Sequence, residues 1–424
     1  MPTHRIDRVL AGHLCSGCGA CAFIGQDQGV RMIDVPDVGR RPLGVRQLPL
    51  LVKDQIAAVC PGATVVSPAA NQHRQSNLDE ILVGPTDAIW EGWASDQEIR
   101  HIGSSGGVVT ALAAYCVEQL GMRLVVHTAM EPAEPWLNRT VVSTDRPGLL
   151  RGAGSRYAPS SPVEALREIE DADGPCVFIG KPCDVAAVAE LRKSRPSLDR
   201  NLGLVLSFFC AGTPPTNASL GLAEELGFDD PARIVSLKYR GEGWPGRFRV
   251  RDLDGREESM TYDASWGSLA KTHRQLRCQL CPDGLGELSD VTSGDAWHRK
   301  GEGSDGISVI LARTERGRKM VVNAAEAGYL TITPSDAAQV VRAQGLVRRR
   351  RLVAARLAAL RVLGLAVPVY SGFRLRRAAS AEGPRVFVRE FAGTVQRIFN
   401  RGYRRPETLA GAPRLRPSGE RGRA

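Results

Sequence analysis

Four of the ten cysteines have the spacing of an iron–sulfur ligand set. Cys15, Cys18 and Cys21 are separated by two small residues each, and Cys60 follows later in a Cys-Pro pair. A tight turn with three thiolates binds three irons of a cubane, and a remote Cys-Pro can supply the fourth ligand. Structural zinc sites usually combine two separated cysteine pairs, or cysteine with histidine. The spacing therefore predicts one 4Fe–4S cluster on these four residues, with zinc as the alternative.

Four further cysteines lie on three separate segments. Cys183 and Cys210 each follow a short apolar run typical of a strand, and Cys278 and Cys281 form a second pair two residues apart. Because the carboxyl ends of parallel strands share one edge of a sheet, we expect Cys183 and Cys210 to lie near each other. Spacing alone leaves open a second 4Fe–4S cluster on all four residues and a zinc site at Cys278 and Cys281.

A glycine-rich loop at residues 103–107 runs directly into a helical pattern at 108–120. Free N–H groups and the positive end of the helix dipole at such a junction favour a phosphate. In the alternative interpretation, Ser104 or Ser105 is an ordinary helix cap. The loop has neither the Walker pattern nor the G-x-G-x-x-G pattern, so neither a P-loop nor a Rossmann site is supported.

The elements that must position these residues alternate between strand and helix, which predicts a mixed α/β (α+β) fold. Cys116 and Cys176 lie in apolar segments and are expected in the core. Residues 71–84 have the composition of a polar linker, and residues 132–147 that of a loop. Strands are predicted at 89–94, 124–128, 176–179, 202–209, 234–239, 248–253 and 307–313, and helices at 163–169, 185–193, 218–226 and 322–327.

The charge is unevenly distributed along the chain. The net charge is +10, but residues 345–424 contain nineteen arginines, no lysine and four glutamates, a local charge of +15. The basicity thus belongs to a C-terminal appendage, which does not indicate a nucleic-acid-binding body. From residue 346 the pattern predicts a basic amphipathic helix, either packed on the body with a solvated arginine face or docked to a partner or membrane surface. Residues from 401 onward have a disorder-prone composition.

Nothing in the sequence indicates export or membrane insertion. The N-terminus lacks an apolar signal-peptide core, and no apolar run reaches the ~18 residues of a spanning helix. We therefore expect a soluble cytoplasmic protein, in which thiols favour metal binding over disulfides.

Several short sequence motifs occur together in a characteristic order. They are the cysteine turn with Cys60-Pro61, Ser105-Gly-Gly-Val-Val-Thr-Ala-Leu112, Gly154-Ser-Arg-Tyr157, Gly180-Lys-Pro-Cys183, Phe209-Cys210, Cys278-x2-Cys281-Pro-Asp and Ser293-Gly-Asp-Ala-Trp297. Over roughly residues 10–365 this set resembles the coenzyme F₄₂₀ hydrogenase/dehydrogenase beta subunit family, which includes 7-hydroxymethyl chlorophyll a reductase.

The resemblance implies an FAD- and iron–sulfur-dependent oxidoreductase. Cys15, Cys18, Cys21 and Cys60 would bind the first 4Fe–4S cluster, and Cys183, Cys210, Cys278 and Cys281 the second. The residues implied to contact FAD are Ser104, Ser105, Gly106, Gly107, Ser155, Arg156, Tyr157 and Lys181. The expected organisation is a ferredoxin-like 4Fe–4S module at 1–70, a flavin-binding region at 85–175, a region with the second cysteine quartet at 176–345 and the basic extension at 346–424.

The family implies electron transfer between a two-electron carrier or organic substrate, FAD and the clusters. Reduced coenzyme F₄₂₀ (a deazaflavin) or ferredoxin is the expected electron partner. A different hypothesis is a non-catalytic electron-transfer subunit that docks a partner enzyme, with the basic C-terminal arm as the docking site. A zinc-stabilised binding protein is the remote alternative.

Overall fold

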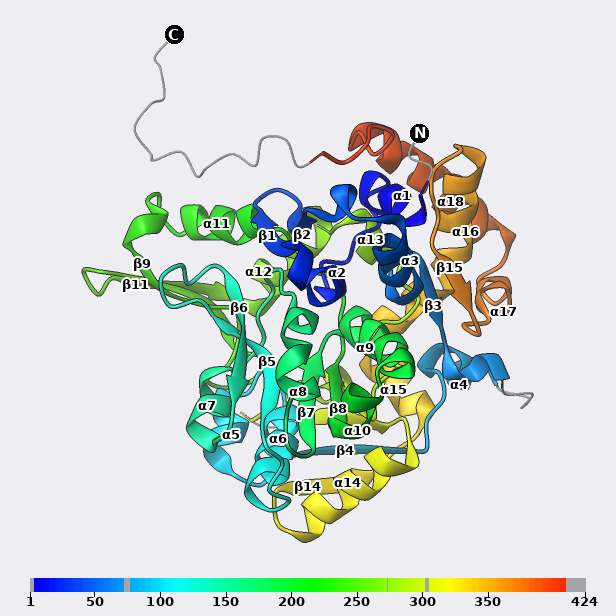
Figure 1. The fold of residues 1–424 in the computed structure, drawn as a ribbon. Helices are drawn as coiled ribbons and strands as arrows, with labels where there is room; N and C mark the ends of the chain where they lie inside the picture. Colours follow the sequence, from blue (N-terminus) through cyan, green and yellow to red (C-terminus); the bar gives the residue numbers. More distant parts are fainter. Residues whose placement is uncertain (1–3, 72–76, 273, 302–304, 409–424) are drawn as a thin grey trace.

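An eight-stranded sheet forms the centre of the molecule (Figure 1), in the order β14-β4-β13-β12-β8-β7-β5-β6. The computed structural model describes residues 4–71, 77–272, 274–301 and 305–408. The strands are β4 (Ala88–Ala94), β5 (Val125–Met130), β6 (Asn138–Ser143), β7 (Cys176–Gly180), β8 (Leu202–Phe208), β12 (Val291–Asp295), β13 (Ser308–Ala312) and β14 (Leu330–Pro334).

The middle of this sheet is parallel and its flanks are antiparallel. β5, β7, β8 and β12 pair in parallel, whereas β13, β4 and β14 on one side and β6 on the other pair antiparallel. The carboxyl ends of β7, β8 and β12 therefore meet at one edge, as expected for α/β proteins. Lys181, Phe209 and Ala296 each follow directly after one of these strands.

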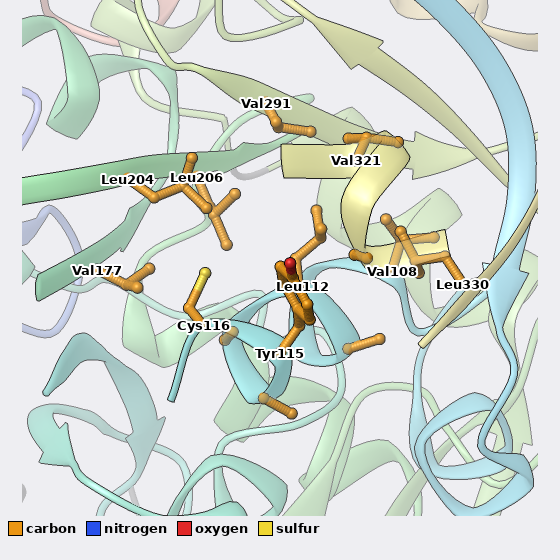
Figure 2. Close-up of a cluster of buried hydrophobic side chains, with 14 of the residues drawn as sticks. Val108, Leu112, Tyr115, Cys116, Val177, Leu204, Leu206, Val291, Val321 and Leu330 are labelled. Carbon is orange, nitrogen blue, oxygen red and sulfur yellow. The ribbon is translucent and has the colours of Figure 1, made fainter. Parts of the chain in front are cut away.

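Helices cover the sheet, and one of them is almost entirely enclosed. The flanking helices are α5 (Gln97–Ile102), α6 (Val108–Glu118), α7 (Arg146–Arg151), α8 (Leu166–Glu170), α9 (Pro182–Ser194), α10 (Pro196–Asn201), α14 (Glu315–Glu326) and α15 (Ala337–Ala343). Leu112 and Cys116 of α6 pack among Val177, Leu204 and Val291 of the sheet (Figure 2). Cys116 is thus a core residue, as predicted, and so is fully buried Cys176 in β7.

A second core joins the two ends of the chain. The N-terminal elements are α1 (Arg5–Ala11), α2 (Ala20–Ile24), β1 (Arg31–Val35), β2 (Gly39–Leu43), α3 (Leu50–Val59) and β3 (Thr64–Val66). Beside them lie α13 (Leu276–Gln279), α16 (Arg348–Val362), β15 (Val369–Ser371), α17 (Leu375–Ser380) and α18 (Pro384–Asn400) (Figure 1). Ile6 and Ile56 share a buried cluster with Val353, Leu360 and Ile398, and β15 pairs in parallel with β3.

The basic helix packs on the body, as one of its two interpretations predicted, but its arginine face is only partly solvated. Arg349 and Arg350 of α16 are buried, and Arg350 forms an ion pair with Glu287. The arginine count gave no indication of this, because Glu287, the partner of Arg350, lies 63 residues away in the sequence. Residues 401–408 are ordered turns and coil against the N-terminal module, contrary to the predicted disorder, and the rest of that prediction, 409–424, lies outside the described residues.

A small antiparallel sheet projects from the body (Figure 1). It comprises β9 (Ile234–Lys238), β10 (Arg247–Asp252) and β11 (Glu257–Thr261), with α11 (Thr216–Glu225) and α12 (Tyr262–Thr272) beside it. The predicted strands at 234–239 and 248–253 and the helix at 218–226 are confirmed. Short 3-10 turns complete the chain at Gln26–Gln28, Val45–Gln47, Pro68–Asn71, Pro162–Ala165, Pro231–Arg233, Trp297–Arg299 and Gly345–Val347.

Two predicted irregular segments contain regular structure. The expected loop at 132–147 includes β6, which forms the sheet edge through backbone hydrogen bonds to β5 and needs no apolar alternation. The expected linker at 71–84 includes α4 (Leu78–Val83), which begins with an Asn77–Glu80 capping box and buries its apolar residues. Within the part of the chain that the structure describes, every helix is too short or too polar to cross a membrane.

Candidate functional site

A cavity of about 480 Å³ opens at the carboxyl edge of the parallel strands. Its size is within the range of small-molecule sites. Its walls come from residues 103–109, 152–158, the ends of β7 and β8, and the aromatic residues Tyr262, Trp266 and Trp297. All the residues implied to contact FAD line this cavity except Gly106, which lies within the loop behind it.

The loop at residues 103–107 is held in place by the start of β13. The Ser105 hydroxyl donates to Ile307 O at 3.1 Å, and Gly106 N donates to Ser308 Oγ at 2.9 Å. Gly107 precedes α6 with a φ of +74°, a conformation that favours glycine. No side chain caps α6, so the prediction that Ser104 or Ser105 caps it is wrong. The uncapped helix start is consequently available to a ligand, and Val108–Thr110 line the cavity.

The loop at residues 152–158 forms an adjoining part of the wall. Ser155 N donates to Ser104 Oγ, which joins the two loops. Arg156 lines the cavity, but its guanidinium donates to Asn138 Oδ1 and to the backbone oxygens of Leu237, Pro135 and Leu137. These contacts give Arg156 a positioning role in the wall.

Aromatic rings extend that wall. The ring centroids of Tyr157 and Trp266 lie 4.6 Å apart, and those of Tyr262 and Trp297 lie 5.1 Å apart in a stacked arrangement. Offset and tilted ring pairs of this kind are mutually stabilising. They give the cavity a rigid, apolar side.

Lys181 and Asp184 form a buried ion pair where β7 meets α9. Lys181 Nζ lies 2.7 Å from Asp184 Oδ1 and also donates to Ser160 O at 2.9 Å. Burial raises the pKa of Asp184 to about 6, while Lys181 acts to lower it. Both side chains flank Cys183, so this ion pair fixes the start of α9 next to that thiol.

The sequence interpretation missed a second buried ion pair in the cavity wall. Arg240 NH2 lies 2.6 Å from Asp295 Oδ1, and Trp244 Nε1 donates to the same oxygen at 2.8 Å. The Arg240 guanidinium also lies 4.7 Å from the centre of the Tyr262 ring. Asp295 belongs to the Ser293–Trp297 motif on which the family resemblance rests. Arg240 follows β9 in a glycine-rich segment that matches no motif of a functional site.

Two more arginines make one end of the cavity positive. Arg274 and Arg349 line it, and among the described residues neither forms an ion pair with a carboxylate. Burial, together with the charges of Arg349 and Arg356, lowers the pKa of Arg274 to about 10. Arg349 NH1 donates to Cys278 O at 3.3 Å, so this positive end adjoins the second cysteine quartet.

The first cysteine quartet comes together as a buried group of thiols. Cys15, Cys18, Cys21 and Cys60 are all buried. Burial and then the charge of Cys60 raise the pKa of Cys18 to about 12, and burial and then Cys15 raise the pKa of Cys60 to about 11. Burial also raises the pKa of Cys21, and the charges of Cys15, Cys18 and Cys60 raise it further by smaller amounts. Four desolvated thiols that repel one another as thiolates are a donor set that a bound metal cluster would stabilise.

The residues of the second quartet come from the start of α9, the segment after β8, and α13 with the turn that follows it. Burial and then the charge of Cys278 raise the pKa of Cys210 to about 12, with Cys281 adding to the effect. Burial has the largest effect on the pKa of Cys183 and raises it. The negative charges of Asp184, Cys210 and Cys18 raise it further. Cys183 therefore lies within electrostatic range of Cys18 in the first quartet, and Cys210 lines the cavity.

In the described part of the chain, no three His, Cys, Asp or Glu side chains lie close enough to hold a single metal ion. A cubane differs from a single ion because each of its thiolate ligands binds a different iron.

Comparisons with known proteins identify relatives over much of the chain. Two models of the coenzyme F₄₂₀ hydrogenase/dehydrogenase beta subunit family match, the N-terminal one at residues 89–167 and the C-terminal one at residues 175–338. The coenzyme F₄₂₀ hydrogenase subunit beta of Methanothermobacter thermautotrophicus is 26% identical over 275 residues, covering 60% of this chain and 87% of that protein.

Two further relatives extend this result. The F₄₂₀-dependent formate dehydrogenase 1 subunit beta of Methanococcus maripaludis is 26% identical over 257 residues, 59% of this chain and 63% of that protein. A chain of the F₄₂₀-reducing NiFe hydrogenase complex from Methanosarcina barkeri superposes with a TM-score of 0.52 at 20% identity, covering 65% of this chain and 94% of that one. This last likeness shows that the fold is shared.

Proposed function

Because the chain belongs to the coenzyme F₄₂₀ hydrogenase/dehydrogenase beta subunit family, we propose that its cavity and its two cysteine quartets form one electron-transfer path. The cavity binds FAD, and the quartets bind two 4Fe–4S clusters. The protein is then an oxidoreductase that moves electrons between a two-electron carrier and one-electron centres.

One observation supports this proposal above the others: the cavity and the quartets are contiguous. Cys210 belongs to the cavity wall and to the second quartet, and Cys183 of that quartet lies within electrostatic range of Cys18 of the first. Three groups of residues with redox-compatible chemistry thus follow one another through the protein. Unrelated structural cysteines would have no reason to form such a series.

The cavity walls suit a flavin. The uncapped start of α6 offers N–H groups to a phosphate, and the rings of Tyr157, Trp266, Tyr262 and Trp297 offer apolar surface to a planar ring system. A flavin exchanges electrons in pairs with an organic carrier and singly with iron–sulfur centres. The chain's own part is to hold the two loops together through Ser104 and Ser155.

Positive charges near the quartets offset the charge that thiolate-ligated clusters carry. Arg277, which is buried, lowers the pKa of Cys281, and Lys181 lowers that of Cys183, in both cases against the larger effect of burial. Hydrogen bonding and nearby charge are the means by which a protein sets cluster potentials. Arg274 and Arg349 make one end of the cavity attractive to an anionic carrier such as reduced F₄₂₀.

A second candidate function follows from the relatives' names. Both relatives are described as beta subunits of a hydrogenase or a formate dehydrogenase. In that case the same path connects F₄₂₀ or ferredoxin to a partner enzyme, and the chain has no organic substrate of its own.

Anaerobic mixing experiments test the proposal. The full chain is mixed in turn with reduced F₄₂₀ and reduced ferredoxin, while flavin absorbance and the electron paramagnetic resonance (EPR) signals of the clusters are recorded. We expect one of these carriers to reduce both flavin and clusters. In the Cys210→Ser variant, reduced F₄₂₀ should still bleach the flavin while the cluster signals fall at least tenfold. A flavin and clusters that respond to neither carrier would contradict the proposal.

A further inference from the structure

A buried arginine lies where the N-terminal module meets the second-quartet region. Arg41 of β2 is 2% exposed, and its guanidinium contacts Glu407 Oε1 at 2.5 Å and Oε2 at 3.1 Å. Its remaining donors reach Arg40 O at 2.9 Å and Gln275 Oε1 at 3.3 Å. Glu407 is the one carboxylate paired with Arg41 among the described residues, and it comes from the far end of the chain.

Residues 401–407, here called the C-terminal strap, hold that carboxylate in place. His13 contacts the strap twice, through Nδ1 to Glu407 Oε2 at 3.1 Å and through Nε2 to Arg405 O at 2.9 Å. Glu407 N donates to Ala11 O at 2.9 Å, and the ring of Tyr403 lies 5.0 Å from that of His13. The strap is thus fixed to the residues immediately before Cys15.

The Arg41–Glu407 pair adjoins both quartets. A side chain at Gly17, between Cys15 and Cys18, would meet Arg40 O at 2.9 Å, so β2 packs directly on the cysteine turn. Gln275, which accepts from Arg41, is the N-cap of the helix that carries Cys278. In agreement with this placement, Arg41 lowers and Glu407 raises the pKa of Cys15, after the larger effect of burial.

We propose that the Arg41–Glu407 ion pair, closed by the C-terminal strap, sets the reduction potentials of the two clusters. Reduction adds negative charge to a cluster, so the nearby guanidinium favours the reduced form and the carboxylate offsets that effect. Glu407 lies beyond residue 338 and Arg41 lies before residue 89, so both partners of the ion pair are outside the family match. The inference rests on the proposed function, because it requires that the quartets hold clusters.

Opposite charge changes on the two partners test the proposal. Midpoint potentials are measured by EPR-monitored redox titration of the iron-loaded full chain. Glu407→Gln keeps the side-chain shape and removes the negative charge, so it should shift at least one cluster potential to more positive values. Arg41→Gln removes the positive charge and should shift the same potential to more negative values. A purely structural role would not produce shifts of opposite sign.

The matched control is Glu382→Gln, which removes a similarly buried carboxylate of the same extension that pairs with Arg351 at 2.8 Å. It should leave both potentials at the wild-type values. If Arg41→Gln does not fold, Glu407→Gln decides alone. Wild-type potentials in an iron-loaded Glu407→Gln protein would overturn this inference and leave the proposed function intact, whereas wild-type protein without iron would overturn both.

Discussion

His127 is a buried base in the wall of the cavity, and its environment makes stability depend on pH. Its side chain hydrogen-bonds to Ser143 Oγ at 2.8 Å. Burial lowers the pKa of His127 from 6.5 to about 4, so the folded protein keeps this imidazole neutral. The unfolded chain takes up a proton first as the pH falls, and stability present at pH 7 is lost as the pH falls from 6.5 toward 4.

We therefore expect the free energy of unfolding to fall by on the order of 2 kcal/mol between pH 7 and pH 5, at about 1.4 kcal/mol per unit of pKa difference. Denaturant unfolding of wild type and His127→Gln at both pH values measures this. Between pH 7 and pH 5, the free energy of unfolding of His127→Gln should fall less than that of wild type, and the difference should be similar to the loss expected from His127. Equal losses in the two proteins would show that His127 does not titrate in this range.

At the same scale, the grouping of the first four cysteines could be predicted, whereas the partners of the buried arginines could not. Cys15, Cys18 and Cys21 are only two residues apart from one another in the sequence, so their local spacing already predicts that they lie together. Arg41 acquires its role from Glu407, 366 residues away, and Arg240 from Asp295, 55 residues away. In a chain with 56 basic residues, nothing local marks which of them fold against a distant carboxylate.

Among the elements, the junction of residues 103–107 with α6 is sterically constrained. Gly107 has a φ of +74°, and a side chain there would meet Ile99 O at 2.7 Å. Gly121 just after the same helix has a φ of +62° with no atom within 4 Å of such a side chain. Both glycines thus have a backbone conformation that disfavours other residues, but only at Gly107 would an added side chain also clash with a neighbouring atom.

Gly107→Ala should destabilise the protein by roughly 1–3 kcal/mol more than Gly121→Ala, because it adds displacement of the loop to the cost of the left-handed conformation. It should also lower the amount of flavin that co-purifies, whereas Gly121→Ala retains it. Thermal unfolding and flavin content per chain measure both effects. Equal flavin content in the two variants would mean that the loop does not contact the cofactor.

Elements whose apolar residues face the core were predictable from sequence. The buried run of β13 and the apolar α6 had the expected patterns. β6 and β11 had no such pattern, because edge strands are stabilised by backbone pairing while their side chains stay largely exposed. α4 was missed because its buried apolar run of Ile81, Leu82 and Val83 is shorter than one helical turn and shows no helical period.

Across the whole molecule, the two chain ends form one unit around the first quartet. Ile398 of α18 lies in the same buried cluster as Cys15, Cys21 and Cys60, and Phe373 is 2% exposed. Fully burying such a side chain contributes about 1.5–3 kcal/mol. The sequence could not predict this contact, since more than 300 residues separate the two ends and neither carries a recognisable pairing signal.

Truncation after Gly372 should therefore destabilise the N-terminal module and cause loss of the first cluster. The iron content of the whole protein should then fall by about half, because one of two clusters is lost. Truncation after Thr408 keeps α17, α18 and Glu407 and should retain wild-type iron. Iron analysis and thermal unfolding of both truncated proteins test this. Wild-type iron and stability after removal of residues 373–424 would show that the extension is not part of the fold.

The most direct test of the central claim is the cofactor content of the protein itself. Iron, acid-labile sulfide, zinc and flavin are measured per chain after anaerobic purification, for wild type and for Cys60→Ser and Cys278→Ser. A path with two clusters and a flavin predicts about eight irons, about eight sulfides and about one FAD in wild type, with about half the iron in either variant. Zinc in place of iron, with no flavin, would contradict the account.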